Sequence, residues 1–253
     1  MKMIMVTGGA GYIGSVCVEQ LLNAGYNVAV FDNLSEGHRL AIDTRATFFQ
    51  GDLSDIEAIK LALRESKAEA VMHFAANALV GESMTNPGKY FRNNVANGVN
   101  LLEAMVAEGV KRFVFSSTCA TFGIPESMPI NETLPQKPIN PYGESKLMFE
   151  KVLRWYGELH GITFVALRYF NAAGATEQFG EDHRIETILS RTSSRLRWAR
   201  RSRSRSTAPT TRHRTAVVSG TTSTSSISRR PTCSHSRPRR APSTTSAPAA
   251  APP

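Results

Sequence analysis

Three glycines near the N-terminus most constrain the fold of this chain. Gly8, Gly11 and Gly14 stand at intervals of three in the segment VTGGAGYIG. The apolar run before them, residues 3–6, predicts a buried strand, and apolar periodicity over residues 13–22 predicts a helix. Strand, glycine turn and helix are typical of a dinucleotide-binding fingerprint, because glycines let the backbone approach a pyrophosphate and the helix N-terminus offers N–H groups and a positive dipole end.

An acidic residue follows where the ribose of such a cofactor would bind. Residues 27–31, Asn-Val-Ala-Val-Phe, predict a second strand that ends at Asp32. The separation from the glycine turn is close to the roughly 20 residues expected for a ribose-binding acid. An Asp at a strand end can also cap a loop, but the two signals together favour cofactor binding.

The rest of residues 1–187 alternates predicted strands with predicted helices. Further strands are predicted at residues 47–50, 70–74, 112–116 and 162–170, and helices at residues 54–64, 87–108 and 141–160. Ser54 and Glu57 form a predicted capping box, and Asn140 is the predicted N-cap before Pro141. This alternation predicts an α/β fold with a Rossmann-like, doubly wound parallel sheet.

A tyrosine and a lysine follow a cluster of hydroxyl groups. Tyr142 and Lys146 are four residues apart, on one face of a predicted helix, and Ser116–Thr118 ends a predicted strand. A free tyrosine has a pKa near 10, but a lysine ammonium one turn away and a nicotinium ring would lower that pKa. The arrangement predicts a proton-transfer pair beside a hydride acceptor, although a Tyr-x-x-x-Lys pair alone also fits an exposed amphipathic helix.

Six segments occur in an order that resembles a known family. They are TGGAGYIG (7–14), DNLS (32–35), HFAA (73–76), FSST (115–118), NPYGESK (140–146) and LRYFNAAG (167–174). They resemble the extended short-chain dehydrogenase/reductase family and, within it, the UDP-sugar 4-epimerases. GEDHR, residues 180–184, is also similar to the epimerases, so the resemblance covers about residues 1–187.

The resemblance implies a function and a set of site residues. The cofactor would be NAD, which stays bound while UDP-glucose and UDP-galactose interconvert through transient oxidation at sugar C4. Tyr142 would take the proton of the 4-hydroxyl with help from Thr118, and Lys146 would bind the nicotinamide ribose and lower the pKa of Tyr142. The implied cofactor contacts are Gly8, Gly11, Tyr12, Ile13 and Gly14 at the pyrophosphate, Asp32 and Asn33 at the adenine ribose, Asp52 and Leu53 at the adenine, and Phe74, Ala75, Asn94, Tyr142, Lys146, Tyr169 and Phe170 along the cofactor. Asn171 and Thr118 would contact the UDP-sugar, and a homodimer through the helices that flank the fourth and fifth strands is expected of the intact protein.

The composition changes abruptly near residue 189. Of the 30 basic residues, 14 arginines lie in residues 190–253, which contain none of the 21 acidic residues, so the first 189 residues carry a net charge of −5. The segment is rich in Arg, Ser, Thr, Pro and Ala and has no helical or strand periodicity, which ordinarily predicts disorder. We therefore expect an NAD-binding domain, residues 1–187, and a basic tail, residues 188–253.

The genetic code offers a sharper interpretation of the tail. With new codons started at the third base of each present codon, residues 207–225 can read GTDYETPDGSCVRDYIHV, which resembles the downstream segment of the epimerases. Residues 196–206 can read ALGKAESISIY in that frame, and residues 226–236 can read EHLAAAHVLAL. We infer a one-frame slip near Thr187–Ile188, by mutation or sequencing error. The chain as it stands would then lack most of the small C-terminal substrate domain, be inactive and expose apolar surface.

Three other functions fit parts of the sequence. A nucleotide-sugar dehydratase would place an Asp-Glu pair directly after the catalytic Thr, where this chain has Cys119 and Ala120. An RNA-binding role for the tail predicts aromatic residues for base stacking, but the tail holds one, Trp198, so no specific nucleic acid partner is expected. A catalytically inactive NAD-binding protein is the epimerase interpretation with the frame slip taken literally.

The expected setting is cytoplasmic. No apolar run reaches the roughly 18 residues of a membrane helix, and the N-terminal apolar run ends in the glycine turn rather than in a signal peptide. Cys17, Cys119 and Cys233 lack the spacing of a disulfide or metal site, and His38 stands alone, so no metal site is expected.

Overall fold

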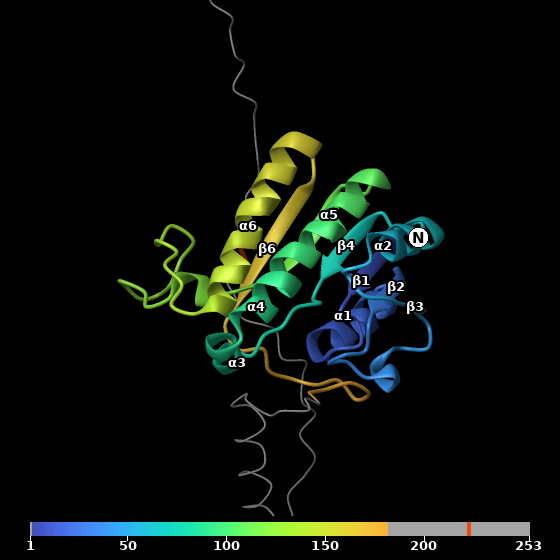
Figure 1. The fold of residues 1–253 in the computed structure, drawn as a ribbon. Coiled ribbons are helices and arrows are strands. Elements are labelled where there is room, and N and C mark those ends of the chain that lie inside the picture. The colour runs from blue at the N-terminus through green and yellow to red at the C-terminus, as the bar shows by residue number, and fades with distance from the viewer. Residues whose placement is uncertain (1, 182–221, 224–253) are drawn as a thin grey trace, which may run out of the picture.

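A six-stranded parallel sheet forms the centre of the molecule (Figure 1). The structure is a computed structural model that describes residues 2–181 and 222–223. The strands follow the order β3-β2-β1-β4-β5-β6. Their bounds are β1 Met3–Thr7, β2 Asn27–Asp32, β3 Thr47–Gln50, β4 Ala70–His73, β5 Arg112–Thr118 and β6 Thr163–Tyr169. This order is that of dinucleotide-binding α/β sheets and confirms the predicted fold class.

A short seventh strand lies in the predicted tail. β7 (Thr222–Ser223) pairs antiparallel with β6, with Thr222 opposite Leu167. The sequence predicts no strand there. The remainder of the predicted tail lies outside the described residues.

Helices cover both faces of the sheet. They are α1 Tyr12–Asn23, α2 Ile56–Ser66, α3 Val80–Thr85, α4 Pro87–Tyr90, α5 Asn97–Ala107 and α6 Pro141–His160, with short helical turns η1 Arg39–Ala41, η2 Phe91–Ala96 and η3 Cys119–Phe122. α2, α5 and α6 pack side by side on one face, and α1 covers the other (Figure 1). Met5 and Val6 are neighbours in β1 but belong to different core clusters, because successive strand side chains point to opposite faces.

The structure corrects the predicted start of the helix after β3. Asp55, not Ser54, is the N-cap of α2, and its carboxylate accepts hydrogen bonds from the N–H groups of Glu57 at 3.1 Å and Ala58 at 3.0 Å. Ser54 lies in the preceding turn, where its N–H donates to Asp52 Oδ1 at 2.8 Å. A carboxylate binds two first-turn N–H groups and also suits the positive end of the helix dipole, which explains the later start.

The predicted single helix over residues 87–108 is three segments. α4 runs into the π-helical turn η2, and α5 follows. A π-helical turn changes the angular position of the residues within it relative to a regular helix. The prediction is therefore correct for the extent of this helical region but not for its regularity.

The helix with the proposed catalytic pair starts where the sequence predicts. The Asn140 side chain accepts a hydrogen bond from Gly143 N–H at 2.8 Å, and Pro141 occupies the first turn of α6. α6 ends at His160, and its C-cap Gly161 has a φ of 70°, in the left-handed region that favours glycine. Asn140 therefore fixes where Tyr142 lies, two residues into the helix.

Candidate active site

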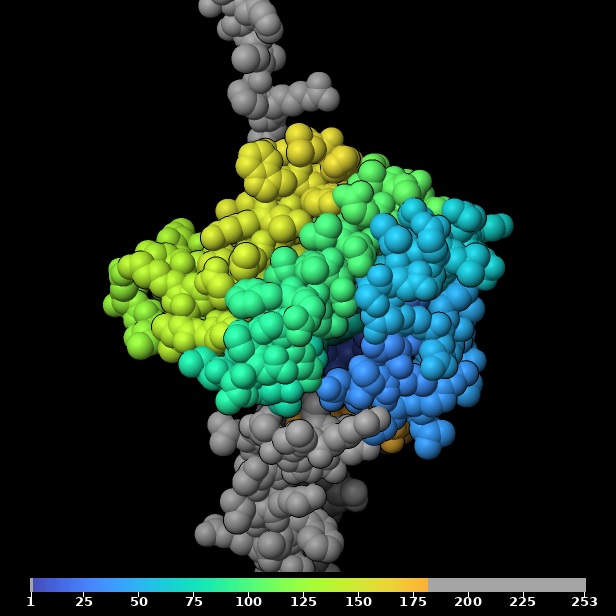
Figure 2. Space-filling view, in the orientation of Figure 1, coloured from blue at the N-terminus to red at the C-terminus, as the bar shows by residue number. Residues whose placement is uncertain are grey.

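The carboxyl ends of the parallel strands bring the predicted site residues to one edge of the sheet. Thr7, Asp32, Thr118 and Tyr169 are the last residues of β1, β2, β5 and β6. The strand order reverses between β1 and β4, and the crevice at such a point is the usual ligand site of an open α/β sheet. Figure 2 shows a hollow there, between the segment of α3 and α4 and the segment after β2, with the N-terminal segment at its floor.

Two glycines of the turn have no room for a side chain. Gly8 has a φ of +76°, and a Cβ on it would lie 2.5 Å from the backbone nitrogen of Ala75. A Cβ on Gly14 would lie 2.1 Å from the carbonyl oxygen of Gly8. Gly11 is the N-cap of α1, and no side chain caps the first N–H groups of that helix. The turn therefore meets the positive end of a helix at a position suited to a pyrophosphate.

Asp32 is held by the backbone on both sides of its carboxylate. Its Oδ2 accepts from Ala10 N–H at 3.0 Å, and its Oδ1 accepts from Leu34 N–H at 2.8 Å. Asn33 Nδ2 donates to Asp52 Oδ2 at 2.6 Å. Hydrogen bonds from Ser54, and then the one from Asn33, lower the pKa of Asp52. The structure thus brings Asp32, Asn33 and Asp52 together beside the glycine turn.

Other predicted cofactor contacts surround this turn. Phe74 N–H donates to Thr7 carbonyl oxygen at 2.8 Å, which places Phe74 and Ala75 directly beside Gly8. Leu53 is buried in the larger core cluster. Ile13 is half-buried in the first turn of α1. Leu53, Phe74 and Ala75 are held by packing against the core clusters, as an orienting site requires.

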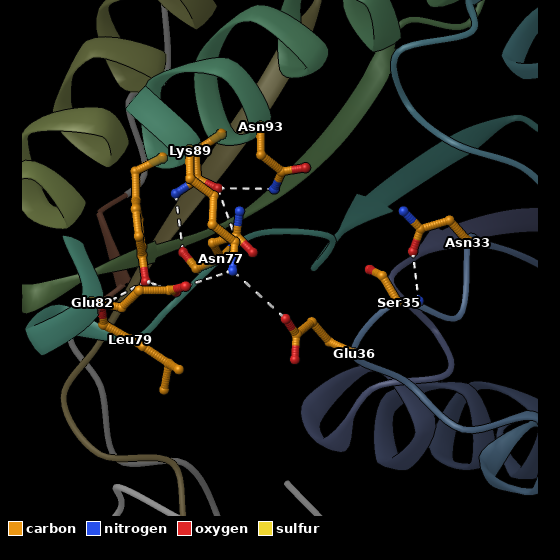
Figure 3. Close-up of polar contacts among 10 residues, drawn as sticks. Asn33, Ser35, Glu36, Asn77, Leu79, Glu82, Lys89 and Asn93 are labelled. Carbon is orange, nitrogen blue, oxygen red and sulfur yellow. Dashed lines mark hydrogen bonds and ion pairs between the residues drawn. The ribbon is translucent and has the colours of Figure 1, made fainter. Parts of the chain in front are cut away.

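A polar cavity of about 590 Å³ opens beside Asp52. It is lined by Ser35, Glu36, Asp52, Ser54, Asn77, Asn86, Lys89, Arg92, Asn93 and Asn97. Lys89 Nζ donates to Glu82 Oε1 at 2.8 Å and lies 3.9 Å from Glu36 Oε1, which belongs to the loop after β2. Figure 3 shows Lys89 and Glu36 facing each other from the two sides of the cavity.

The structure does not bring Asn94, a predicted cofactor contact, to this cavity. Asn94 is 2 % exposed, and its amide donates to Asn77 carbonyl oxygen and Ser145 Oγ, both at 3.0 Å. Its Oδ1 accepts from Asn77 N–H at 2.9 Å. Asn93 lines the cavity instead (Figure 3). Both residues belong to the π-helical turn, which apolar periodicity does not reveal.

Tyr142, Lys146 and Thr118 meet at the same edge of the sheet. Lys146 is 2 % exposed, and its Nζ donates to the carbonyl oxygen of Ser116 at 2.8 Å and lies 6.0 Å from the centre of the Tyr142 ring. Burial lowers the pKa of Lys146 to about 7, while the charge of Glu150 acts in the opposite direction. Burial raises the pKa of Tyr142, and a hydrogen bond with the Thr118 side chain opposes that rise.

The predicted lowering of the Tyr142 pKa assumes Lys146 together with a nicotinium ring, and in the chain by itself the pKa of Tyr142 is raised instead. A buried phenolate loses its hydration, and this loss outweighs the hydrogen bond with Thr118. Lys146 with a pKa of about 7 is only partly charged at neutral pH, so it supplies less positive charge than a solvated ammonium. A lowered pKa at Tyr142 needs a further cation beside the ring.

The end of β6 and the segment after it contain three more predicted site residues. Burial raises the pKa of Tyr169 to about 12, whereas Phe170 and Asn171 are exposed. Tyr12 hydroxyl donates to the carbonyl oxygen of Gly174 at 2.6 Å, which ties this segment to the glycine turn. The segment therefore lies along the proposed cofactor site.

Three polar residues near the site are absent from the predicted set. Glu150 and Arg168 form an ion pair at 2.7 Å, and Ser117 Oγ donates to Glu150 at 2.5 Å. All three are buried. The sequence offers three signals for them: Ser117 lies in the hydroxyl cluster Ser116–Thr118, Arg168 lies in the segment 167–174, and Glu150 lies four residues after Lys146 on the same helix face.

Two structural absences hold within the described residues. In residues 2–181 and 222–223, no three His, Cys, Asp or Glu side chains gather into a group that could hold a metal ion. In that same part of the chain, no helix combines the length and apolar character needed to cross a membrane.

The strand order, the glycine turn and the acid at the end of β2 define a Rossmann-type dinucleotide-binding domain. The chain belongs to the NAD dependent epimerase/dehydratase family, whose sequence model matches residues 4–205. That match covers more than half of the chain.

Relatives of known name are similar over the same part of the chain. A UDP-glucose 4-epimerase of Lacticaseibacillus casei is 54% identical over 188 residues, and one of Streptococcus mutans is 55% identical over 190 residues. Each comparison covers 74% of this chain and 57% of the relative, so the chain spans little more than half the length of these relatives.

Solved structures give the same result. The UDP-glucose 4-epimerase of Brucella ovis in complex with NAD has a TM-score of 0.73 and 44% identity, and the comparison covers 75% of this chain and 58% of that one. The UDP-glucose 4-epimerase of Bifidobacterium longum in complex with NAD+ and UDP has a TM-score of 0.70 and 35% identity, and the comparison covers 73% of this chain and 58% of that one.

Proposed function

We propose that residues 1–187 are the NAD-binding half of a UDP-glucose 4-epimerase, an isomerase that interconverts UDP-glucose and UDP-galactose in galactose metabolism. The observation that carries the proposal is the meeting of Tyr142, Thr118 and Lys146 at the sheet edge that holds the glycine turn. Identity above 50% to two UDP-glucose 4-epimerases supports the UDP-sugar as substrate.

The residues present fit NAD. α1 begins without a side-chain cap beside glycines that leave the backbone open to a pyrophosphate. Asp32 is fixed where a carboxylate suits a ribose 2′-hydroxyl, and its charge disfavours the 2′-phosphate of NADP. Bound NAD would supply the reversible oxidation at sugar C4.

The chain's own residues would move and hold the proton. As the phenolate, Tyr142 would accept the proton of the sugar 4-hydroxyl at its oxygen, becoming the phenol, and would later return that proton. Thr118, already hydrogen-bonded to Tyr142, would hold the sugar hydroxyl in place. Lys146 would bind the nicotinamide ribose, and the Ser116 carbonyl fixes its Nζ for that task. The pKa of Tyr142, which burial raises, would fall beside a cationic cofactor.

We propose that the sequence from about Ile188 is out of frame, so that most of the uridine-binding domain is not encoded in this reading. The chain would then bind NAD with little or no turnover.

The proposed assembly of the intact protein is a homodimer through α5 and α6. Met148, Trp155 and Leu159 are 40%, 62% and 72% exposed, and their spacing places them in one stripe along α6. Large apolar side chains gathered on a surface helix mark an interaction surface. α5 and α6 lie side by side on the outside of the sheet (Figure 1).

A cytoplasmic setting is also proposed. Cys17 and Cys119 are free thiols, which suits a reducing compartment. Burial raises the pKa of both thiols, so they stay protonated and unreactive.

Binding and turnover test the proposed function. The purified 253-residue chain should bind NAD, and Tyr142→Phe should bind it within about threefold, since the loss of one hydrogen bond has a small net cost. In the frame-restored protein, Tyr142→Phe should lower epimerase activity by about 10²–10⁴-fold. Tyr26→Phe, at a tyrosine that is 39% exposed, is the matched control and should change neither. A chain that does not bind NAD, or a restored protein without epimerase activity, would make the proposal wrong.

A further inference from the structure

A buried carboxylate joins the strands and the helix that carry the proposed catalytic residues. Glu150 Oε1 accepts from Ser117 Oγ at 2.5 Å and from Arg168 Nε at 3.0 Å. Its Oε2 accepts from Arg168 Nη2 at 2.7 Å and from Gln136 Nε2 at 3.2 Å. The side chains of Arg168 and Glu150 are 8% and 3% exposed. Donors from β5, β6 and the loop before α6 thus converge on one carboxylate of α6.

Two of the three partners of Glu150, Ser117 and Arg168, are each next to a residue of the proposed site. Ser117 precedes Thr118 in β5, and Arg168 precedes Tyr169 in β6. Ser117 and Arg168 are also directly opposite in the register of the two strands. Glu150 lies one helical turn after Lys146 on α6. Because Glu150 also bonds β5 and β6, a shift of its carboxylate would move the ends of these two strands relative to the helix that carries Tyr142 and Lys146.

Stability alone is a weak reason for this network. Buried ion pairs are often no better for stability than well-packed apolar residues of the same volume, because two charges lose their hydration. What the network does supply is a fixed separation between β5 and α6. Lys146 Nζ bonds the carbonyl of Ser116 from the same helix face, one residue before Ser117. Arg168 is fixed further by lying 5.1 Å over the Phe122 ring.

We infer that Glu150 is a positioning residue, which holds Thr118 against Tyr142 and Lys146 against Ser116 so that the nicotinamide end of the cofactor meets a preorganised site. The inference rests on the proposed function and names the residue that orients its catalytic pair. Glu150 acts through its hydrogen bonds to Ser117 and Arg168. Loss of one such bond can displace the catalytic side chains by a small distance without unfolding the protein.

The first test compares NAD with AMP on the full chain. AMP shares the adenosine end, which Asp32 would hold, but it lacks the nicotinamide ribose that Lys146 would bind. Ser117→Ala removes the tether to β5 and leaves the Glu150–Arg168 pair in place. We expect this variant to bind NAD about tenfold more weakly, as for loss of one hydrogen bond to a charged group. Its affinity for AMP should not change. Ser117→Thr keeps the hydroxyl and should restore NAD affinity.

The second test uses the pH dependence of NAD binding. Tyr142 and Glu150 face Lys146 from its own helix, His73 faces it from β4, and Arg168 lies behind Glu150 on β6. The Glu150 charge raises the pKa of Lys146, so Glu150→Gln should move the midpoint of the binding profile to lower pH. A purely structural loss would weaken binding at every pH without moving the midpoint. Arg64→Gln, which breaks the surface pair with Glu108 at 2.6 Å, is the matched control and should do neither.

The outcomes separate the inference from the proposed function. The inference is overturned if Ser117→Ala weakens NAD and AMP equally or weakens neither, or if Glu150→Gln leaves the midpoint in place. If the unsubstituted chain binds neither NAD nor AMP, the proposed function fails, and the inference fails with it.

Discussion

Thr7 Oγ1 lies 2.7 Å from His73 Nδ1, and the two residues are directly opposite each other in the register of β1 and β4. Both are buried, and the His73 ring stacks with Phe115 at a centroid separation of 6.0 Å. Burial and, second, the nearby charge of Lys146 lower the pKa of His73 to about 3. The imidazole is therefore neutral in the folded chain near pH 7 and supports the strand end from which the glycine turn starts.

Acid should destabilise the fold through His73. A histidine in the unfolded chain has a pKa near 6.5, so between pH 6.5 and 3 the unfolded state binds a proton that the folded state does not, and stability falls as pH falls. From pH 7 to pH 5 this contribution is about 2 kcal/mol. Urea unfolding at both pH values should show this loss in the unsubstituted chain and in His160→Gln, but not in His73→Gln. An equal loss in all three proteins would contradict the prediction.

Gly14→Ala should disrupt the glycine turn. The added Cβ would lie 2.1 Å from Gly8 carbonyl oxygen and 2.9 Å from Gly9 Cα, so either the turn or α1 must move. We expect a loss of about 1–3 kcal/mol in unfolding free energy, as for other overpacked sites, and NAD affinity at least about tenfold lower. Thermal unfolding and calorimetric titration measure the two effects.

Gly81→Ala is the control for that experiment. A Cβ on Gly81 meets nothing within 4 Å, and the residue lies in helix α3, where alanine is favoured over glycine by up to about 1 kcal/mol. Its stability should hold or rise and its NAD affinity should not change. Similar losses in Gly81→Ala and Gly14→Ala would show that the close approach at Gly14 is not what matters.

Local signals account for what the sequence predicts well. The glycine turn and the Asn140 cap are each read from a few adjacent residues, and the structure has both where expected. Strand alternation is equally local, because successive side chains point to opposite faces. The order of the strands follows from the alternation of strands and helices together with the position of the fingerprint.

Non-local contacts account for what the sequence does not predict. Glu150 acquires its role from Ser117 and Arg168, which are 33 and 18 residues away and meet it only when β5 and β6 lie beside α6. A π-helical turn decides that Asn93 rather than Asn94 lines the polar cavity, and no apolar pattern encodes that turn. The raised pKa of Tyr142 depends on burial, which the spacing of two residues does not specify.

Lys146→Met should lower NAD affinity without lowering stability. The pKa of Lys146 is about 7 when folded and 10.5 when unfolded, so as pH falls from 10.5 to 7 the unfolded state binds a proton that the folded state lacks, and stability falls. Methionine removes this charge from the core while keeping a similar length. At pH 7 the unfolding free energy should equal or exceed that of the unsubstituted chain by up to about 2 kcal/mol, and NAD affinity should fall at least about tenfold. A less stable variant that keeps full affinity would refute this assignment of Lys146.

The coding DNA across codons 180–240 should contain the epimerase continuation in a second frame. Each new codon has a free first base, but its second and third bases are largely fixed by the present residues, so the reading GTDYETPDGSCVRDYIHV is too long and too ordered to be expected by chance. Sequencing an independent template distinguishes the two origins of the slip. DNA that runs from GEDHR straight into the continuation makes the tail an artefact and predicts full epimerase activity. A confirmed slip predicts a chain that binds NAD without turnover. Codons that cannot give the second reading would exclude the frame slip, and the Arg/Ser segment would then need a separate function.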